Sequence, residues 1–216
     1  ADFTVCRYDR RGRGDSGDTP PYAVEREVED LSALVNALGG AAFAYGYSSG
    51  ALLALHAAAR GVPFERLVLM EPPLQDPHIK GPDPLTRELE VLVSEGRYED
   101  AVAHFHSAIG VPPDVIETVR GTQRWSRMVA IAPTFVHDCR LSDAMRPDIL
   151  AAITVPTLIL DSEGSTDDLT GSAAAAARLI SGAGHVSLPG EWHVVAPALI
   201  AREIKMFIKP VAGEAK

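Results

Sequence analysis

The stretch AYGYSSGALLAL, Ala44–Leu55, places a serine between two glycines at the junction of two apolar segments. Residues 41–45, AAFAY, have the character of a short buried strand, and residues 49–61, SGALLALHAAARG, that of a helix ending at a glycine. In a strand–turn–helix unit, a G-x-S-x-G pattern holds the serine on a sharp turn, with its hydroxyl at the carboxyl edge of the sheet. The pattern therefore predicts that Ser48 is a nucleophile; the alternative is a purely structural tight turn.

Strand and helix patterns alternate on both sides of this stretch. Apolar and β-branched runs predict strands at 3–8, 41–45, 66–70, 155–160 and 185–188. Amphipathic or alanine-rich segments predict helices at 25–38, 49–61, 171–180 and 196–208. Because several of the strands are continuously apolar, we expect an α/β fold with a mostly parallel sheet covered by helices on both faces.

The pattern changes between residues 74 and 150, where strand signals disappear. Helices separated by proline and glycine are predicted there at 84–95, 97–109, 113–120 and 122–131. We therefore expect residues 1–73 and 151–216 to form the core, and residues 74–150 to form a helical lid.

Composition excludes several classes of partner. The chain has 216 residues, is 46% hydrophobic and carries a net charge of -9, which argues against binding to nucleic acid or to an anionic membrane. No apolar run approaches the ~18 residues of a membrane span. Cys6 and Cys139 stand far apart without metal-ligand spacing, which favours a reducing, cytoplasmic location. Neither a metal constellation nor a glycine-rich phosphate loop is present, so no cofactor is expected.

A nucleophilic serine needs a base, and the best placed of the seven histidines is His193. It follows the last predicted strand in LPGEWHVVAP and precedes the terminal helix, so it is expected at the same sheet edge as Ser48. His56 lies about two turns along the helix after Ser48 and is expected to pack instead. The N–H of Ser49, at a helix N-terminus, is a candidate oxyanion donor.

Four motifs follow one another in an order that resembles the α/β-hydrolase-fold superfamily. They are DRRGRGDSG (9–17), GYSSG (46–50), VPTLIL (155–160) and GEWH (190–193). The chain is similar to lid-bearing serine hydrolases related to esterases, lactonases and cofactor-free haloperoxidases. The resemblance implies Ser48 as nucleophile and His193 as base.

The third member of the triad stays open. The resemblance implies an acid nine residues beyond the proline of PTL, but Ser165 occupies that position. Glu71, directly after the strand predicted at 66–70, is the first candidate, because some members of the superfamily place their acid there and a carboxylate can orient the imidazole from that side. The alternatives are Asp161, Asp167 and Asp138.

The resemblance also implies three strands and a helix before residue 3, including a strand in the middle of the sheet. We therefore expect that a segment of about 50–70 residues is absent or lies on a separate chain. The loop after that central strand supplies the second oxyanion donor in the superfamily.

Aromatic and apolar residues of the predicted lid are candidates for lining a substrate pocket: Phe105, Trp125, Met128, Phe135 and, at its entrance, Leu74. They favour a medium-sized, apolar small molecule. The prediction is a serine hydrolase acting on an ester, thioester or lactone. The alternative is a non-hydrolytic protein of the same fold, either a catalyst of cyclisation or rearrangement or a small-ligand receptor.

Overall fold

The computed structural model of the protein describes residues 3–76, 78–79 and 81–208. The chain divides into two compact units. One, called the helical unit below, is Ala1–Ala23 with Lys80–Arg140; the other, called the sheet unit, is Val24–Ile79 with Leu141–Lys216. Each unit has its own hydrophobic core.

The sheet unit alternates strands and helices along the chain. Its elements are α1 (Val24–Ala37), β1 (Ala42–Tyr47), α2 (Ser49–Ala59), β2 (Phe64–Met70), α8 (Pro147–Ala151), β3 (Thr157–Ser162), α9 (Asp167–Leu179), β4 (Gly184–Leu188), β5 (Gly190–Glu191), β6 (Val194–Val195) and α10 (Pro197–Ile208). The four longer strands form a parallel sheet in the order β1-β2-β3-β4, while β5 and β6 form a short antiparallel hairpin.

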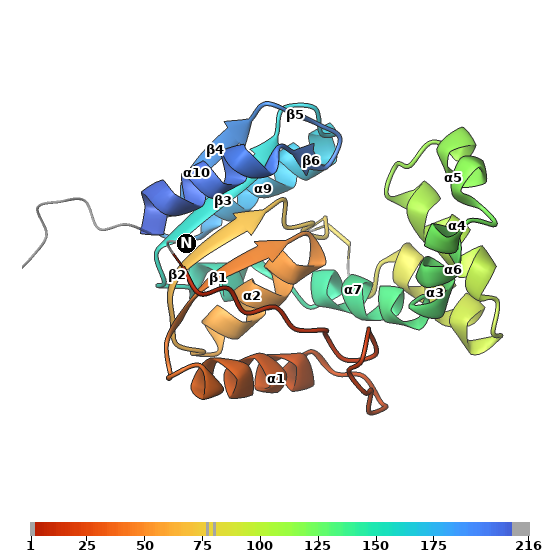
Figure 1. Cartoon of the computed structure of the whole chain (residues 1–216), viewed down its shortest axis with the longest axis horizontal. Coiled ribbons are helices and arrows are strands. Elements are labelled where there is room, and N and C mark those ends of the chain that lie inside the picture. The colour runs from red at the N-terminus through yellow and green to blue at the C-terminus, as the bar shows by residue number, and fades with distance from the viewer. Residues whose placement is uncertain (1–2, 77, 80, 209–216) are drawn as a thin grey trace, which may run out of the picture. The chain divides into compact units, whose positions relative to one another are not determined.

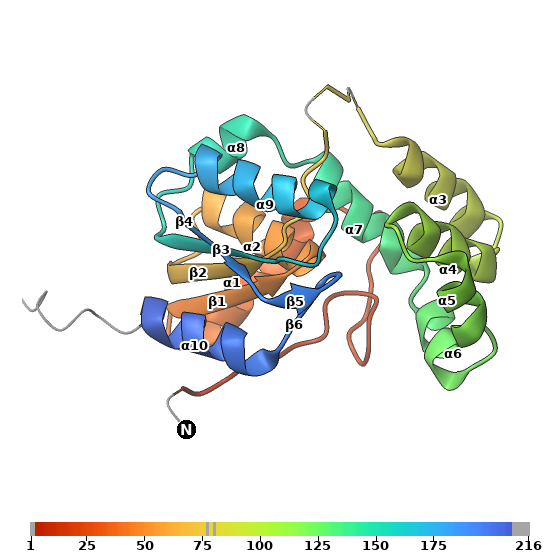
Figure 2. The same ribbon diagram turned by 90° about the horizontal axis from the view of Figure 1, so that it is seen from above.

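Helices cover both faces of the parallel sheet. In Figure 2, α10 lies against one face, and α8 and α9 lie over the other. The core under α10 is built from alternate residues of the strands: Val68, Met70, Leu158, Leu160, Leu188 and Val195. The predicted α/β class, with a parallel sheet between two helical layers, is confirmed.

The strand predicted at residues 3–8 is not formed, so that prediction was wrong. Residues 3–8 pair with none of the strands β1 to β4 of the described sheet, and a strand persists only where a neighbouring strand shares its backbone hydrogen bonds. Val5 is accordingly 78% exposed. The following turn is instead held inside the helical unit, where Arg10 and Arg13 contact Asp138 at 2.9 and 2.6 Å.

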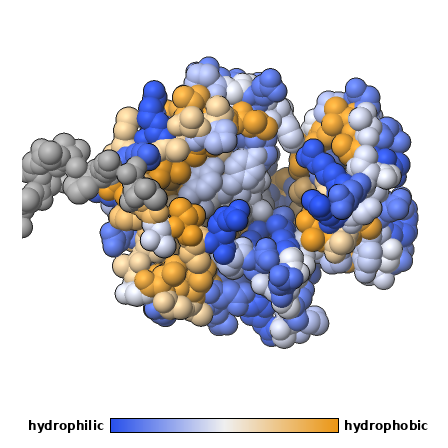
Figure 3. Space-filling view, in the orientation of Figure 1, coloured by the Kyte–Doolittle hydropathy of each residue, from blue (hydrophilic) through white to orange (hydrophobic). Residues whose placement is uncertain are grey.

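Strand β1 forms one edge of the sheet and exposes aromatic side chains. Phe43, Tyr45 and Tyr47, at alternate positions of this strand, are all about half exposed. Hydrophobic residues are also visible as orange patches on the face shown in Figure 3. A preceding segment that would cover this edge stays a prediction.

The helical unit contains α3 (Pro84–Ser94), α4 (Tyr98–Ala108), α5 (Pro113–Val119), α6 (Gln123–Ala130) and most of α7 (Pro133–Asp143). Side-chain caps begin two of these helices: Asp83 accepts from the N–H of Leu85 at 2.9 Å, and Thr122 caps α6. The boundaries of the two units differ from the predicted ones, because residues 1–23 group with these helices and residues 141–150 with the sheet. The elements can be followed in Figure 1.

Candidate active site

Ser48 occupies a strained turn between β1 and α2. Its φ is 53° and its ψ is -122°, a conformation that residues with a side chain rarely adopt. The turn is tight because Gly46 lies against the helix: a Cβ built on it would come within 2.6 Å of the Cα of Ala51. Although Ser48 is the N-cap of α2, its side chain does not cap the helix. The Ser48 hydroxyl therefore lies at the turn and makes no capping hydrogen bond to the backbone of α2.

Glu71 is fully buried at the end of β2, where its φ is 46°. One carboxylate oxygen, Oε1, accepts from the N–H of Ser162 at 2.8 Å, and the other, Oε2, accepts from Nδ1 of His193. Burial opposes ionisation and would raise the pKa of Glu71, but hydrogen bonds from His193, the Ser165 hydroxyl and the Ser162 N–H outweigh it and lower that pKa. Glu71 is therefore a carboxylate at neutral pH.

His193 sits in the turn of the β5–β6 hairpin with a φ of 54°. Both of its backbone polar groups are bound: its N–H donates to Oγ of Ser165 at 2.8 Å, and its C=O accepts from the Tyr47 hydroxyl. The rings of Tyr47 and His193 lie 4.6 Å apart, and the His193 side chain is 14% exposed. The ring is therefore fixed in place but reachable from solvent.

Strain concentrates on these three residues. Within residues 3–76, 78–79 and 81–208, the non-glycine residues with positive φ are Ser48, Glu71 and His193. Each such conformation costs on the order of 1–3 kcal/mol and persists only where the surrounding structure enforces it. Such strain marks functional sites in other proteins, so the backbone alone points to these positions.

Backbone contacts bring the three residues to one edge of the sheet. The N–H of Ser48 donates to the C=O of Met70 at 2.9 Å, which places it beside the end of β2 where Glu71 follows. Tyr47, the residue before Ser48, contacts His193 through its hydroxyl and its ring. Because Glu71 is ionised and accepts from Nδ1, the hydrogen of neutral His193 lies on Nδ1 and the lone pair on Nε2. Nε2 is thus the basic atom.

Ser49, the predicted oxyanion donor, directly follows the turn at Ser48. Ser49 is the first residue of α2, where backbone N–H groups have no acceptor within the helix and the helix dipole favours negative charge. The predicted role of the Ser49 N–H is therefore compatible with its position.

Two of the other predicted acids bind other groups, and the third is exposed. Asp161, 1% exposed, pairs with His185 at 2.6 Å, and Asp167 is exposed at the start of α9. Asp138 is held in the helical unit by two arginines. Of the four candidates, Glu71 is the one that the structure brings to the histidine.

His56 packs in the interior, as predicted. Its Nε2 contacts the C=O of Leu141 at 2.9 Å, and Arg60 lies 3.0 Å from its Nδ1. The ring is fully buried, and this burial lowers the pKa of His56.

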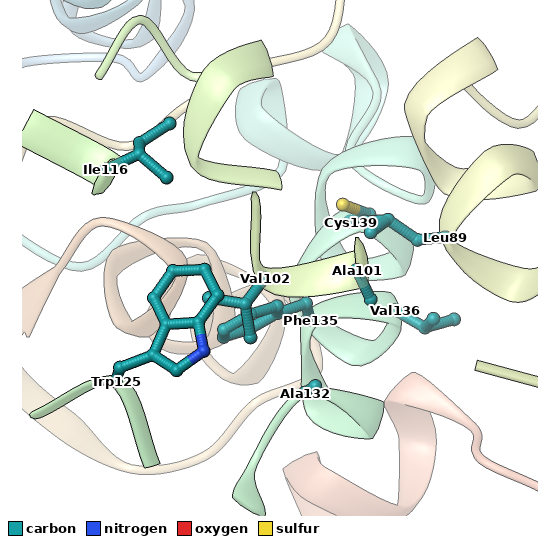
Figure 4. Packing of buried hydrophobic residues seen from close by; sticks show 9 residues of the cluster. All are labelled: Leu89, Ala101, Val102, Ile116, Trp125, Ala132, Phe135, Val136 and Cys139. Carbon is teal, nitrogen blue, oxygen red and sulfur yellow. The ribbon is translucent and has the colours of Figure 1, made fainter. Parts of the chain in front are cut away.

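Four of the predicted substrate contacts belong to the core of the helical unit, whereas Leu74 lies in the sheet unit. Trp125 is 3% exposed and lies in one cluster with Val102 and Phe135, shown in Figure 4. Phe105 stacks on Phe135 with ring centroids 4.5 Å apart, and Met128 packs at the margin of the cluster. Their first role is to hold the helices together, and contact with a substrate stays a prediction.

Sequence reasoning missed two residues that touch His193. Tyr47 is the first of the two variable positions of the G-x-S-x-G pattern, and Ser165 was named only as the place where an acid was expected. No sequence signal connects either of them to residue 193.

Among residues 3–76, 78–79 and 81–208, no group of three or more His, Cys, Asp or Glu side chains is arranged to hold a metal ion. Within the same residues, no helix combines the length and the apolar character needed to cross a membrane.

Comparisons with known proteins concern the family and the fold of the chain. The model of the alpha/beta hydrolase family matches residues 1–203. An alpha/beta hydrolase from Sphaerobacter thermophilus is 43% identical, with a TM-score of 0.81 over 94% of this chain and 80% of that one. The enol-lactonase from Burkholderia xenovorans is 22% identical, with a TM-score of 0.67 over 94% of this chain and 79% of that one.

One curated relative matches over a shorter stretch. The N-formylmaleamate deformylase of Pseudomonas putida is 41% identical over 79 residues, which are 35% of this chain and 30% of that protein. The match thus spans less than a third of the length of this relative.

Proposed function

Because the chain belongs to the alpha/beta hydrolase family, we propose that it is a serine hydrolase whose triad is Ser48, His193 and Glu71. The observation that carries the proposal is the hydrogen bond from His193 Nδ1 to the buried, ionised carboxylate of Glu71. This bond keeps the hydrogen of the imidazole on Nδ1, so the lone pair of Nε2 can act as a base at the sheet edge that carries Ser48.

The proposed reaction has two halves. Nε2 of His193 takes the proton of the Ser48 hydroxyl as its oxygen attacks an acyl carbonyl, and the N–H of Ser49 stabilises the oxyanion that forms. The imidazolium, stabilised by Glu71, then protonates the leaving group. In the second half, His193 activates a water that attacks the acyl–Ser48 ester and releases the acid product.

The proposed substrates are small esters, thioesters or lactones, medium-sized and apolar. Support comes from the names of two similar proteins, an enol-lactonase and a deformylase, which describe reactions at lactone and formyl groups. A lid role for the helical unit, substrate contacts of Phe105, Trp125 and Met128, a cytoplasmic location and a preceding segment that completes the sheet are further parts of the proposal.

The test is covalent labelling with a fluorophosphonate probe, followed by intact mass and peptide mapping. We expect one adduct, on Ser48, that disappears in Ser48→Ala. The matched control is Ser49→Ala, which removes the neighbouring hydroxyl but keeps its backbone N–H, and it should still be labelled. Hydrolysis of ester and lactone panels by the wild-type protein, but not by Ser48→Ala, then defines the bond.

If the folded wild-type protein takes up no probe and hydrolyses no member of the panels, the hydrolase proposal is wrong. Retained ligand affinity in Ser48→Ala would instead favour the receptor alternative.

A further inference from the structure

Tyr47 links the turn of Ser48 to the hairpin that carries His193. Its hydroxyl donates to the backbone C=O of His193, and the two rings lie 4.6 Å apart with an interplanar angle of 39°. Tyr47 directly precedes Ser48, whereas 146 residues separate it from His193. One side chain therefore contacts the candidate base, while its own backbone continues into the turn of the candidate nucleophile.

The backbone of Tyr47 is fixed by the parallel sheet. Tyr47 is the last residue of β1, and its register partner is Met70, the last residue of β2. The next residues along the two strands are Ser48 and Glu71. The position of Tyr47 is thus set relative to both the nucleophile and the acid of the proposed triad.

Among the described strands, no ladder of backbone hydrogen bonds joins the hairpin of His193 to β1, because β5 and β6 pair with each other as a separate sheet. Side chains make the links instead. Near the acid, the Ser162 hydroxyl donates to the C=O of Glu191 at 2.7 Å. Near the nucleophile, Tyr47 binds His193 itself, whose φ of 54° persists only where the surrounding structure enforces it.

We propose that Tyr47 is a positioning residue of the proposed triad, which holds His193 in register with Ser48 through its hydroxyl and its ring. The inference rests on the proposed function. Removal of the hydroxyl releases the C=O of His193 and loosens the hold on a strained residue, so the ring of His193 is less often in place beside Glu71.

The first test is Tyr47→Phe, which removes the hydroxyl and keeps the ring. We expect kcat to fall about tenfold with KM little changed, because the substrate still binds while the base is misplaced. The rate of fluorophosphonate labelling of Ser48 should fall by a similar factor. Tyr47→Leu also removes the ring and should lose more activity than Tyr47→Phe; equal losses would contradict the contribution of the ring.

The matched control is Tyr45→Phe. Tyr45 lies two residues earlier on β1 and is 45% exposed, against 42% for Tyr47, and its hydroxyl makes no hydrogen bond to the described residues. Burial, followed by the charge of Glu71, raises the pKa of both hydroxyls to about 12, so each keeps its proton near neutral pH. The two substitutions therefore remove chemically similar groups, and Tyr45→Phe should keep the wild-type kcat and labelling rate.

Three outcomes overturn the proposal. Urea unfolding first establishes that each variant is folded. An unchanged kcat and labelling rate in Tyr47→Phe, or an equal loss in Tyr45→Phe, would show that the hydroxyl of Tyr47 does not position the base. A rise in KM with kcat unchanged would make Tyr47 a substrate contact instead.

A second readout needs no turnover. The proton on Nδ1 of His193, bound to the Glu71 carboxylate, should give a far-downfield proton NMR signal, assigned by its loss in His193→Gln. In Tyr47→Phe this proton should exchange faster with water and its signal should broaden, whereas in Tyr45→Phe it should not. An unchanged signal contradicts the role of Tyr47, whereas absence of both labelling and turnover in the folded wild type contradicts the proposed function.

Discussion

Replacing Glu71 by glutamine tests the candidate triad at its acid. The side chain keeps its size, and its amide oxygen can still accept the Ser162 N–H that Oε1 accepts now. The amide NH2 then faces Nδ1 of His193, which favours the tautomer with its hydrogen on Nε2. In that tautomer the imidazole cannot act as base toward Ser48.

The lost charge sets the size of the effect. Glu71 is fully buried, and its carboxylate binds the ring of His193 directly. For charge centres about 4 Å apart at an effective dielectric constant of about 20, the attraction between imidazolium and carboxylate is worth about 4 kcal/mol. Since about 1.4 kcal/mol corresponds to a factor of ten in rate, kcat should fall by about 10³-fold.

The assay is the hydrolysis of a chromogenic ester together with the rate of fluorophosphonate labelling, so that acylation is followed with and without turnover. The matched control is Asp161→Asn, because Asp161 is also a buried carboxylate that binds a histidine ring, that of His185 at 2.6 Å. Urea unfolding of both variants separates loss of fold from loss of the base. Near wild-type activity in a folded Glu71→Gln, or an equal loss in Asp161→Asn, would refute the reasoning.

Three other predictions concern stability. Gly46→Ala should lower the free energy of unfolding by about 1–3 kcal/mol, because the new Cβ would meet the backbone of Ala51. Gly50→Ala is the control and should not lower it, because no atom lies within 4 Å of a Cβ built there. Urea titration compares the two variants. Ser48→Gly should raise the free energy of unfolding by about 1 kcal/mol while abolishing hydrolysis, because glycine relieves the strain at φ 53°; a loss of stability would contradict this account of the turn. Burial lowers the pKa of His56, and the unfolded chain binds its proton below about pH 6.5, so the free energy of unfolding should fall as pH drops through that value. Unfolding of His56→Gln should show a weaker dependence on pH, and an unchanged dependence would exclude His56 as its source.

Local patterns predicted most of the fold. The helices expected at 84–95, 97–109, 113–120 and 122–131 are found as α3 to α6 with ends within one or two residues, because proline and glycine punctuate them. The strand expected at 3–8 is not formed. A strand needs a neighbouring strand to pair with, and the local sequence does not show whether that neighbour is present.

The same distinction applies to the candidate site. Ser48 could be singled out as a candidate because its turn has a local signature, and His193 because it follows the last predicted strand. The choice among four carboxylates could not be made from sequence, since it depends on a contact between residues 122 positions apart. The contacts of Ser165 and Tyr47 with His193 are equally non-local, at separations of 28 and 146 residues.

The wide separation of Glu71 and His193 also sets an order of events during synthesis. Ser48 and β2 leave the ribosome before the histidine, which follows Glu71 by 122 residues. At a synthesis rate of about 5–20 residues per second, His193 is added on the order of 6–24 s after Glu71. Under the proposed function, the nascent chain carries a serine without a base throughout that time, and we expect no reaction with acyl compounds until the hairpin that bears His193 has emerged.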